Sequence, residues 1–93
     1  MHHPLYLNDP HEGDNYLVIP SERRSRMLDL ITEYEVDFVF TGHLHKNNYK
    51  KLGSTELVST GPVGFPLGND PSGIRHVQVH GDFLTHEYSA LTS

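Results

Sequence analysis

A helical hydrophobic pattern that passes directly into an apolar run constrains this chain more than any other feature. Apolar residues recur at spacings of three and four residues and predict an amphipathic helix over 22–34: Met27, Leu28, Ile31 and Tyr34. Ser21 offers a side-chain oxygen to the free amides of the first turn, where Glu22 suits the helix dipole. Residues 36–40 are β-branched and aromatic, which predicts a largely buried strand. A helix followed by such a strand indicates an α/β fold.

The second half of the chain predicts two β-hairpins. The first spans 49–59 around Gly53-Ser54-Thr55, and the second spans 74–88 around Gly81-Asp82, a dipeptide that can adopt the positive φ of a tight turn. A two-residue turn in the second hairpin places five side chains on one face, which we expect to be the inner face: Val77, Val79, Leu84, His86 and Tyr88.

Two further segments predict irregular structure. Residues 7–20 are rich in Asn, Asp, Pro and Gly, which favour turns, and predict an exposed loop. The 13 residues from Gly61 to Gly73 contain four Gly and three Pro and predict a long loop.

Length, charge and cysteine content limit the function classes. The 93 residues suffice for one small domain or for a piece of a larger one, so we treat 1–93 as one unit. Seven basic against twelve acidic residues give a net charge of -5, which argues against nucleic acid as a partner. No apolar run approaches the roughly 20 residues of a membrane helix, so we expect no membrane partner and a cytoplasmic location, with an upstream targeting segment left open. The absence of cysteine excludes disulfides and thiolate metal sites.

Eight histidines remain as candidate ligands, and two of them follow the strand at 36–40. Gly42-His43-Leu44-His45 lies where that strand ends, the place where open α/β sheets bind ligands. Imidazole is the commonest neutral ligand of transition metals, so this tetrapeptide fits a metal site, and it fits a loop with two solvated histidines equally well. Metallo-β-lactamase-like and cupin sites are excluded, because Asn47-Asn48 and Tyr49-Lys50 stand where their further ligands would be.

Two motifs, taken in order, resemble the late motifs of the calcineurin-like metallophosphoesterases. His2-His3-Pro4-Leu5-Tyr6 is similar to the His-Pro motif and Gly42-His43-Leu44-His45 to the Gly-His-x-His motif, with a helix and a strand between them. Residues 67–75 resemble a serine/threonine phosphatase branch of that superfamily. The resemblance implies the C-terminal part of a layered α/β/β/α sandwich, with the N-terminal metal-binding half of the domain missing. A remnant of an affinity tag is the alternative interpretation of Met1-His2-His3.

The resemblance also implies a site and its cofactors. His2, in preference to His3, and His43 would bind one metal ion, and His45 would bind its neighbour. The cofactors would be two divalent or trivalent transition-metal ions, Mn, Fe or Zn, and the substrate a phosphorylated molecule. Four other histidines receive no role: His11, His76 and His80 are expected to face solvent, and His86 to be half-buried and hydrogen-bonded.

Three short segments match early motifs of the family only by coincidence: Asp9-Pro10-His11, Gly13-Asp14 and Gly68-Asn69-Asp70. In the family these motifs precede the His-Pro segment and are separated by whole strand and helix units. The chain therefore lacks the bridging Asp, the Asn ligand and the general acid, so its catalytic residues are unknown.

The predicted function is the C-terminal portion of a metal-dependent phosphoesterase that acts on phosphomonoesters, phosphoprotein among them. The isolated chain should be inactive and should bind metal weakly. Two alternatives are a non-catalytic metal-binding or regulatory module that completes a site with another chain, and an inactive remnant that binds a partner.

Overall fold

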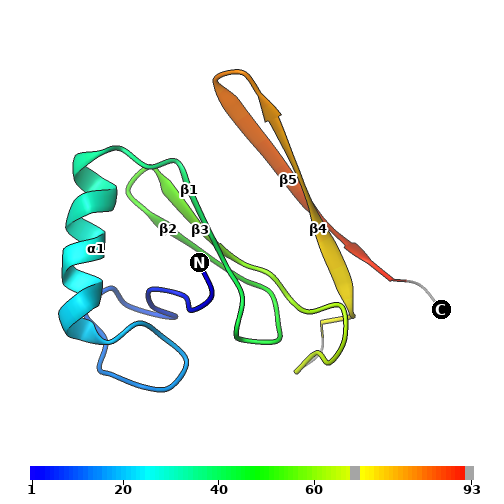
Figure 1. The fold of residues 1–93 in the computed structure, drawn as a ribbon, viewed down its shortest axis with the longest axis horizontal. Coiled ribbons are helices and arrows are strands. Elements are labelled where there is room, and N and C mark those ends of the chain that lie inside the picture. Colours follow the sequence, from blue (N-terminus) through cyan, green and yellow to red (C-terminus); the bar gives the residue numbers. More distant parts are fainter. Residues whose placement is uncertain (68–69, 92–93) are drawn as a thin grey trace.

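One helix and five strands in two sheets make up the computed structural model, which describes residues 1–67 and 70–91 (Figure 1). The elements are α1 (Ser21–Glu33), β1 (Phe38–Thr41), β2 (Asn48–Leu52), β3 (Thr55–Ser59), β4 (Gly73–His80) and β5 (Phe83–Ala90). The first sheet has the order β1-β3-β2, with β1 parallel and β2 antiparallel to β3. Strands β4 and β5 form a separate antiparallel ribbon. The mixed α/β class is confirmed, and the layered sandwich stays a prediction.

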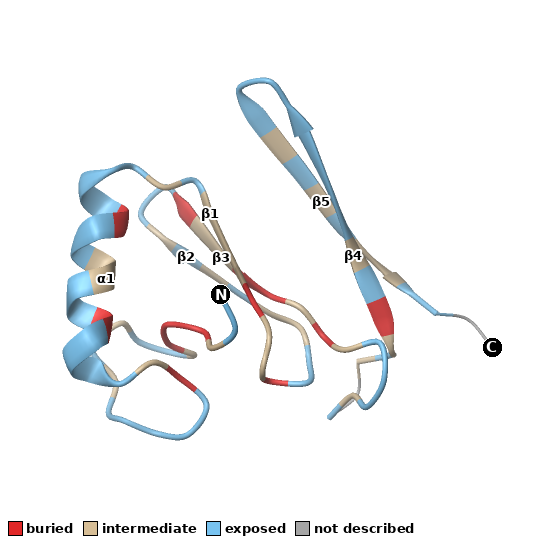
Figure 2. Ribbon diagram, in the orientation of Figure 1, coloured by how far each residue is buried: buried red, intermediate tan, exposed pale blue. Residues whose placement is uncertain are grey.

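Helix α1 packs on the three-stranded sheet through one apolar face. Ile31 is buried with Leu5 and Tyr6 of the N-terminal segment (Figure 2). Partly buried apolar residues from the helix, the loops and all three strands surround them: Ile19, Met27, Leu28, Val36, Val39, Leu52 and Leu57. Tyr34 was predicted on this face, but it ends the helix and is 71% exposed. No helix in the described residues is long and apolar enough to cross a bilayer.

The start of α1 is capped from a distance, not by Ser21 as predicted. Pro20 is the N-cap residue, and Ser21 itself is already helical. The Ser21 N–H donates to Asp14 Oδ1 at 2.6 Å, and this bond is the main reason that the pKa of Asp14 lies below its usual range. A carboxylate seven residues upstream therefore satisfies an amide that the helix leaves unpaired.

The loop before α1 is exposed, as predicted, but it is held by two charged side chains. Glu12 Oε1 accepts hydrogen bonds from three successive backbone N–H groups, those of Leu7, Asn8 and Asp9. Arg24, on α1, is only 1% exposed and donates to the backbone carbonyls of Pro10, Glu12 and Ile19. These bonds replace the regular hydrogen bonds that the loop lacks.

The turns of both antiparallel pairs have two residues. Leu52 pairs with Thr55, so Gly53-Ser54 forms the first turn, one residue shorter than predicted. His80 pairs with Phe83 across Gly81-Asp82, as predicted. Gly53 and Gly81 adopt φ values of 60° and 74°, which a residue with a Cβ disfavours.

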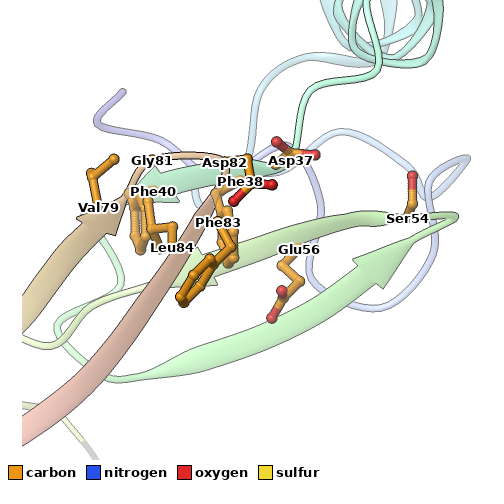
Figure 3. Close-up of a pocket in the computed structure, with 10 residues that line it drawn as sticks. All are labelled: Asp37, Phe38, Phe40, Ser54, Glu56, Val79, Gly81, Asp82, Phe83 and Leu84. Carbon is orange, nitrogen blue, oxygen red and sulfur yellow. The ribbon is translucent and has the colours of Figure 1, made fainter.

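The inner face predicted for the β4–β5 ribbon is only partly inside. Val77 is 44% and Val79 is 74% exposed, whereas Leu84, His86 and Tyr88 are half-buried. A groove of about 580 Å³ lies between β1 and the tip of the ribbon. Strand β1 contributes Phe38 and Phe40 to its lining, and the ribbon contributes Val79 and Leu84 (Figure 3). Apolar side chains therefore remain accessible at the tip.

Candidate metal centre

A tight turn at the end of β1 places His43 beside the N-terminal segment. The Leu44 N–H donates to the Gly42 carbonyl at 2.8 Å, and His43 between them has φ of 69°, which defines the rarer, strained form of the γ-turn. The Gly42 N–H also donates to the His2 carbonyl at 2.7 Å. Because β1 and residues 1–2 are joined at this point, two histidines 41 positions apart in the sequence become neighbours.

His2 and His43 face each other through ring nitrogens. His2 Nε2 lies 3.1 Å from His43 Nδ1, and His43 Nε2 lies 3.2 Å from the backbone carbonyl oxygen of Tyr16. A carbonyl oxygen only accepts hydrogen bonds, so Nε2 of a neutral His43 carries the proton. The Nδ1 atom of His43 then directs its lone pair toward His2.

This arrangement fits a metal ion as well as a direct hydrogen bond. In the absence of an ion, His2 Nε2–H can donate to the lone pair of His43 Nδ1. His2 Nε2 and His43 Nδ1 are the two nitrogens that would hold a transition-metal ion here. Metal-binding histidines commonly donate their other N–H to a backbone carbonyl, which is the contact that His43 makes with Tyr16. The donor set therefore fits a transition metal.

His3 joins this pair, although the sequence favoured His2 over it. Each of His2, His3 and His43 offers one ligand atom, and these three atoms all lie within 4.8 Å of one another. The His3 ring packs on the His43 ring with 4.0 Å between centroids. Desolvation, and then the proximity of His43 and His2, lowers the pKa of His3. The adjacent pair His2-His3 was the only feature of the sequence that could have indicated His3 as the third residue of this group.

His45 lies outside that group of three in the part of the chain that the structure describes. It is exposed and has φ of 58°. Its Nδ1 atom lies 2.9 Å from the Phe65 carbonyl oxygen, and its own carbonyl accepts from the Leu67 N–H at 2.6 Å. By the same argument as for His43, Nδ1 of a neutral His45 carries the proton and Nε2 has the lone pair. The assignment of His45 to a second ion stays a prediction.

The remaining histidines lie outside this group. His11 and His76 are exposed, and exposed His80 contacts the Thr85 hydroxyl. His86 is half-buried and accepts from Arg75 at Nδ1, as predicted.

The segments that match early motifs by coincidence include acidic residues that bond to the backbone. Asp9 accepts from the His11 N–H and Asp14 from the Ser21 N–H. Gly68 and Asn69 lie outside the described residues, and Asp70 accepts from the Asn47 N–H. Sequence reasoning missed the contact of Tyr16 with His43, because no periodic signal shows where the loop at 7–20 returns to the sheet.

Comparison with known proteins tests the family resemblance. The chain is 34% identical to the serine/threonine-protein phosphatase CPPED1 of Bos taurus over 90 residues, and 32% identical to CPPED1 of Homo sapiens over 91 and of Danio rerio over 90. The predicted resemblance is confirmed. CPPED1 is calcineurin-like phosphoesterase domain-containing protein 1, the branch that residues 67–75 indicated. Each match covers 97% of this chain but only 29% of the CPPED1 protein, and no family model matches the chain.

Proposed function

We propose that the chain is the C-terminal portion of a metal-dependent phosphoesterase that hydrolyses phosphomonoesters, with phosphoprotein as the candidate substrate class. One observation carries the proposal: His2 and His43 meet through ring nitrogens, while the second nitrogen of His43 is held by a backbone carbonyl. The CPPED1 relatives, which are named serine/threonine-protein phosphatases, support the choice of reaction and substrate.

In this proposal His2, His43 and His45 contribute ligands to two metal ions. When bound, these ions would supply Lewis-acid stabilisation of the phosphoryl charge and lower the pKa of the attacking water. The chain's own contribution is to orient the imidazoles. The Tyr16 carbonyl oxygen directs the Nδ1 lone pair of His43 toward His2, and the Phe65 carbonyl oxygen leaves Nε2 of His45 as the nitrogen with the free lone pair. The two histidines of the Gly-His-x-His motif therefore use opposite nitrogens.

The proposal requires groups from outside these 93 residues. The resemblance implies a bridging carboxylate, an Asn ligand and a general acid, and the chain spans less than a third of the length of its CPPED1 relatives. Without a positioned acid the leaving alkoxide is not protonated. We therefore expect residues 1–93 alone to be inactive on p-nitrophenyl phosphate with Mn, Fe or Zn.

The test uses a longer protein in which this chain is joined to a segment that carries the missing motifs. Such a protein should hydrolyse p-nitrophenyl phosphate, and His43→Ala and His45→Ala should each reduce turnover by at least about 100-fold, since each removes a ligand. His76→Ala and His80→Ala are the matched controls and should leave turnover nearly unchanged. Equal losses in all four variants would show that the site is misassigned.

A non-catalytic metal-binding module is the second candidate, and His3 favours it. Three imidazoles within one chain could hold a single ion without ligands from another segment. Calorimetric titration of the 93-residue chain with Zn or Mn separates the two functions. The phosphoesterase proposal predicts weak binding, because ligands divided between two ions leave both coordination shells unfilled. Submicromolar binding of one ion, lost in His3→Ala, would favour the module.

A further inference from the structure

Asn47 joins three segments of the chain, and it lies shortly after the turn that carries His43. Its side-chain Oδ1 accepts hydrogen bonds from the Gly61 N–H at 2.9 Å and from Arg75 Nη2 at 3.1 Å. Its backbone N–H donates to Asp70 Oδ2 at 2.7 Å. Asn47 is half-buried and lies two residues after His45. It therefore fixes the segment that leads from His45 into β2.

Arg75 makes this junction rigid. Besides Asn47, its guanidinium donates to Thr60 Oγ1 at 2.9 Å and to His86 Nδ1 at 3.0 Å. It also lies 5.5 Å from the centroid of the Tyr88 ring, and burial lowers the pKa of Arg75. A planar guanidinium has donors in fixed directions, so these contacts hold the Asn47 amide in one orientation.

The clasp loop, which we define as residues 60–67, leaves this junction and returns to His45. At its base the Gly61 N–H is bound by Asn47. At its far end the Leu67 N–H donates to the His45 carbonyl, and the Phe65 carbonyl accepts from His45 Nδ1. Both ends of the loop are therefore attached to the segment 45–47.

Apolar burial does little to hold this loop in place. The side chains of Val63, Phe65 and Leu67 are 59%, 71% and 52% exposed. A loop that buries so little apolar surface depends on its hydrogen bonds for its position. Thr60 and Pro62 are also bonded at the base, through the Thr60 N–H to the Thr41 carbonyl at 2.9 Å and the Gly73 N–H to the Pro62 carbonyl at 3.2 Å. Of the contacts at the base, only the bond from Gly61 attaches the loop to the segment 45–47 that carries His45.

We propose that Asn47 is a positioning residue: by closing the base of the clasp loop, it keeps the Phe65 carbonyl on His45 Nδ1 and so makes Nε2 the nitrogen that His45 presents to a ligand. The proposed function supplies the metal as that ligand. The tautomer of His45, however, is a property of the metal-free chain and can be tested without activity.

The test is the side-chain ¹⁵N NMR spectrum of His45 in the metal-free 93-residue chain at about pH 8, above the ordinary pKa of imidazole. The parent chain should show the Nδ1–H tautomer. Asn47→Leu removes the acceptor at similar size, and His45 should then revert to the Nε2–H form that predominates in free histidine. Asn47→Asp keeps an oxygen at Oδ1 and should restore the parent tautomer. Asn48→Leu, at the neighbouring asparagine, is the matched control and should change nothing.

Two results would overturn the proposal: a folded Asn47→Leu chain that keeps the Nδ1–H form, or an Asn48→Leu chain that loses it equally. Backbone amide shifts of β4 and β5 report whether each variant folds. If the Asn47→Leu chain does not fold, Asn47→Ala replaces it, and we expect the same loss of the Nδ1–H form. Zinc titration of the parent chain tests the proposed function separately. If the chain does not bind zinc, the result for the His45 tautomer still stands.

Discussion

Replacement of Arg24 by methionine tests how the helix supports the candidate site. Arg24 is only 1% exposed and donates to the carbonyls of Glu12 at 2.6 Å, of Ile19 through two nitrogens, and of Pro10 at 3.3 Å. These acceptors belong to the loop that carries Tyr16, whose carbonyl orients His43. Methionine fills a similar volume but donates no hydrogen bond.

The expected loss follows from the contacts with Glu12 and Ile19. A hydrogen bond from a charged donor contributes about 1.5–3 kcal/mol, so these two acceptors together account for about 3–6 kcal/mol. The Pro10 contact is long and adds little. The loop can recover part of the loss by turning its carbonyls to water, so we expect Arg24→Met to lower the free energy of unfolding by about 3 kcal/mol. Arg24→Lys keeps one charged donor and should lose about half as much.

Urea unfolding followed by circular dichroism measures this loss. The slope of the unfolding free energy against urea concentration should stay unchanged. Arg23→Met, at the exposed neighbour, is the matched control and should lie within about 0.5 kcal/mol of the parent. The His43 side-chain ¹⁵N signals should also shift in Arg24→Met, because Tyr16 is no longer fixed. A loss below about 1 kcal/mol, or an equal loss in Arg23→Met, would refute the argument.

Two further predictions concern stability. A Cβ on Gly73 would lie 2.7 Å from the Tyr88 ring, so Gly73→Ala should destabilise the chain by about 1–3 kcal/mol in urea unfolding, whereas Gly64→Ala, with open space around it, should not. Burial alone would raise the pKa of Glu12, but three backbone N–H donors and Arg24 together lower it. The ionised Glu12 side chain therefore contributes its full stability above its ordinary pKa of 4.5, and this stability is lost as the pH falls further. Glu12→Gln should flatten the decline of the unfolding free energy at acid pH. An unchanged decline in this variant would contradict the prediction.

The parts of the fold that could be predicted depend on local patterns. The helical spacing through Ile31 and the turn at Gly81-Asp82 depend only on residues that are close in the sequence, and both were predicted correctly. The cap of the helix was predicted wrongly, because the carboxylate of Asp14 reaches it across a loop whose path no periodicity shows. Tyr34 was misplaced because the helix ends at that residue before its ring can return to the sheet.

The candidate site was partly predictable for a similar reason. Motif resemblance indicated His2 and His43, and the docking of residues 1–2 beside β1 brings them together. The position of His45 depends on a bond to the backbone of a loop 20 residues away, and a backbone carbonyl has no signature in the sequence. The contribution of Asn47 is hidden for the same reason.

The β4–β5 ribbon governs how the chain should behave at high concentration. In the described part of the chain both of its strands are sheet edges, and apolar side chains such as Val79 and Phe83 lie exposed near its tip. Such edges are templates for pairing with a second molecule, and ordinary soluble proteins block them with charge. Arg75 and Glu87 are the only Lys, Arg, Asp or Glu residues in the two strands, so the overall charge of -5 supplies much of the repulsion between molecules. That repulsion vanishes near pH 5.8, where solutions of the chain should be most prone to intermolecular β-sheet formation and precipitation.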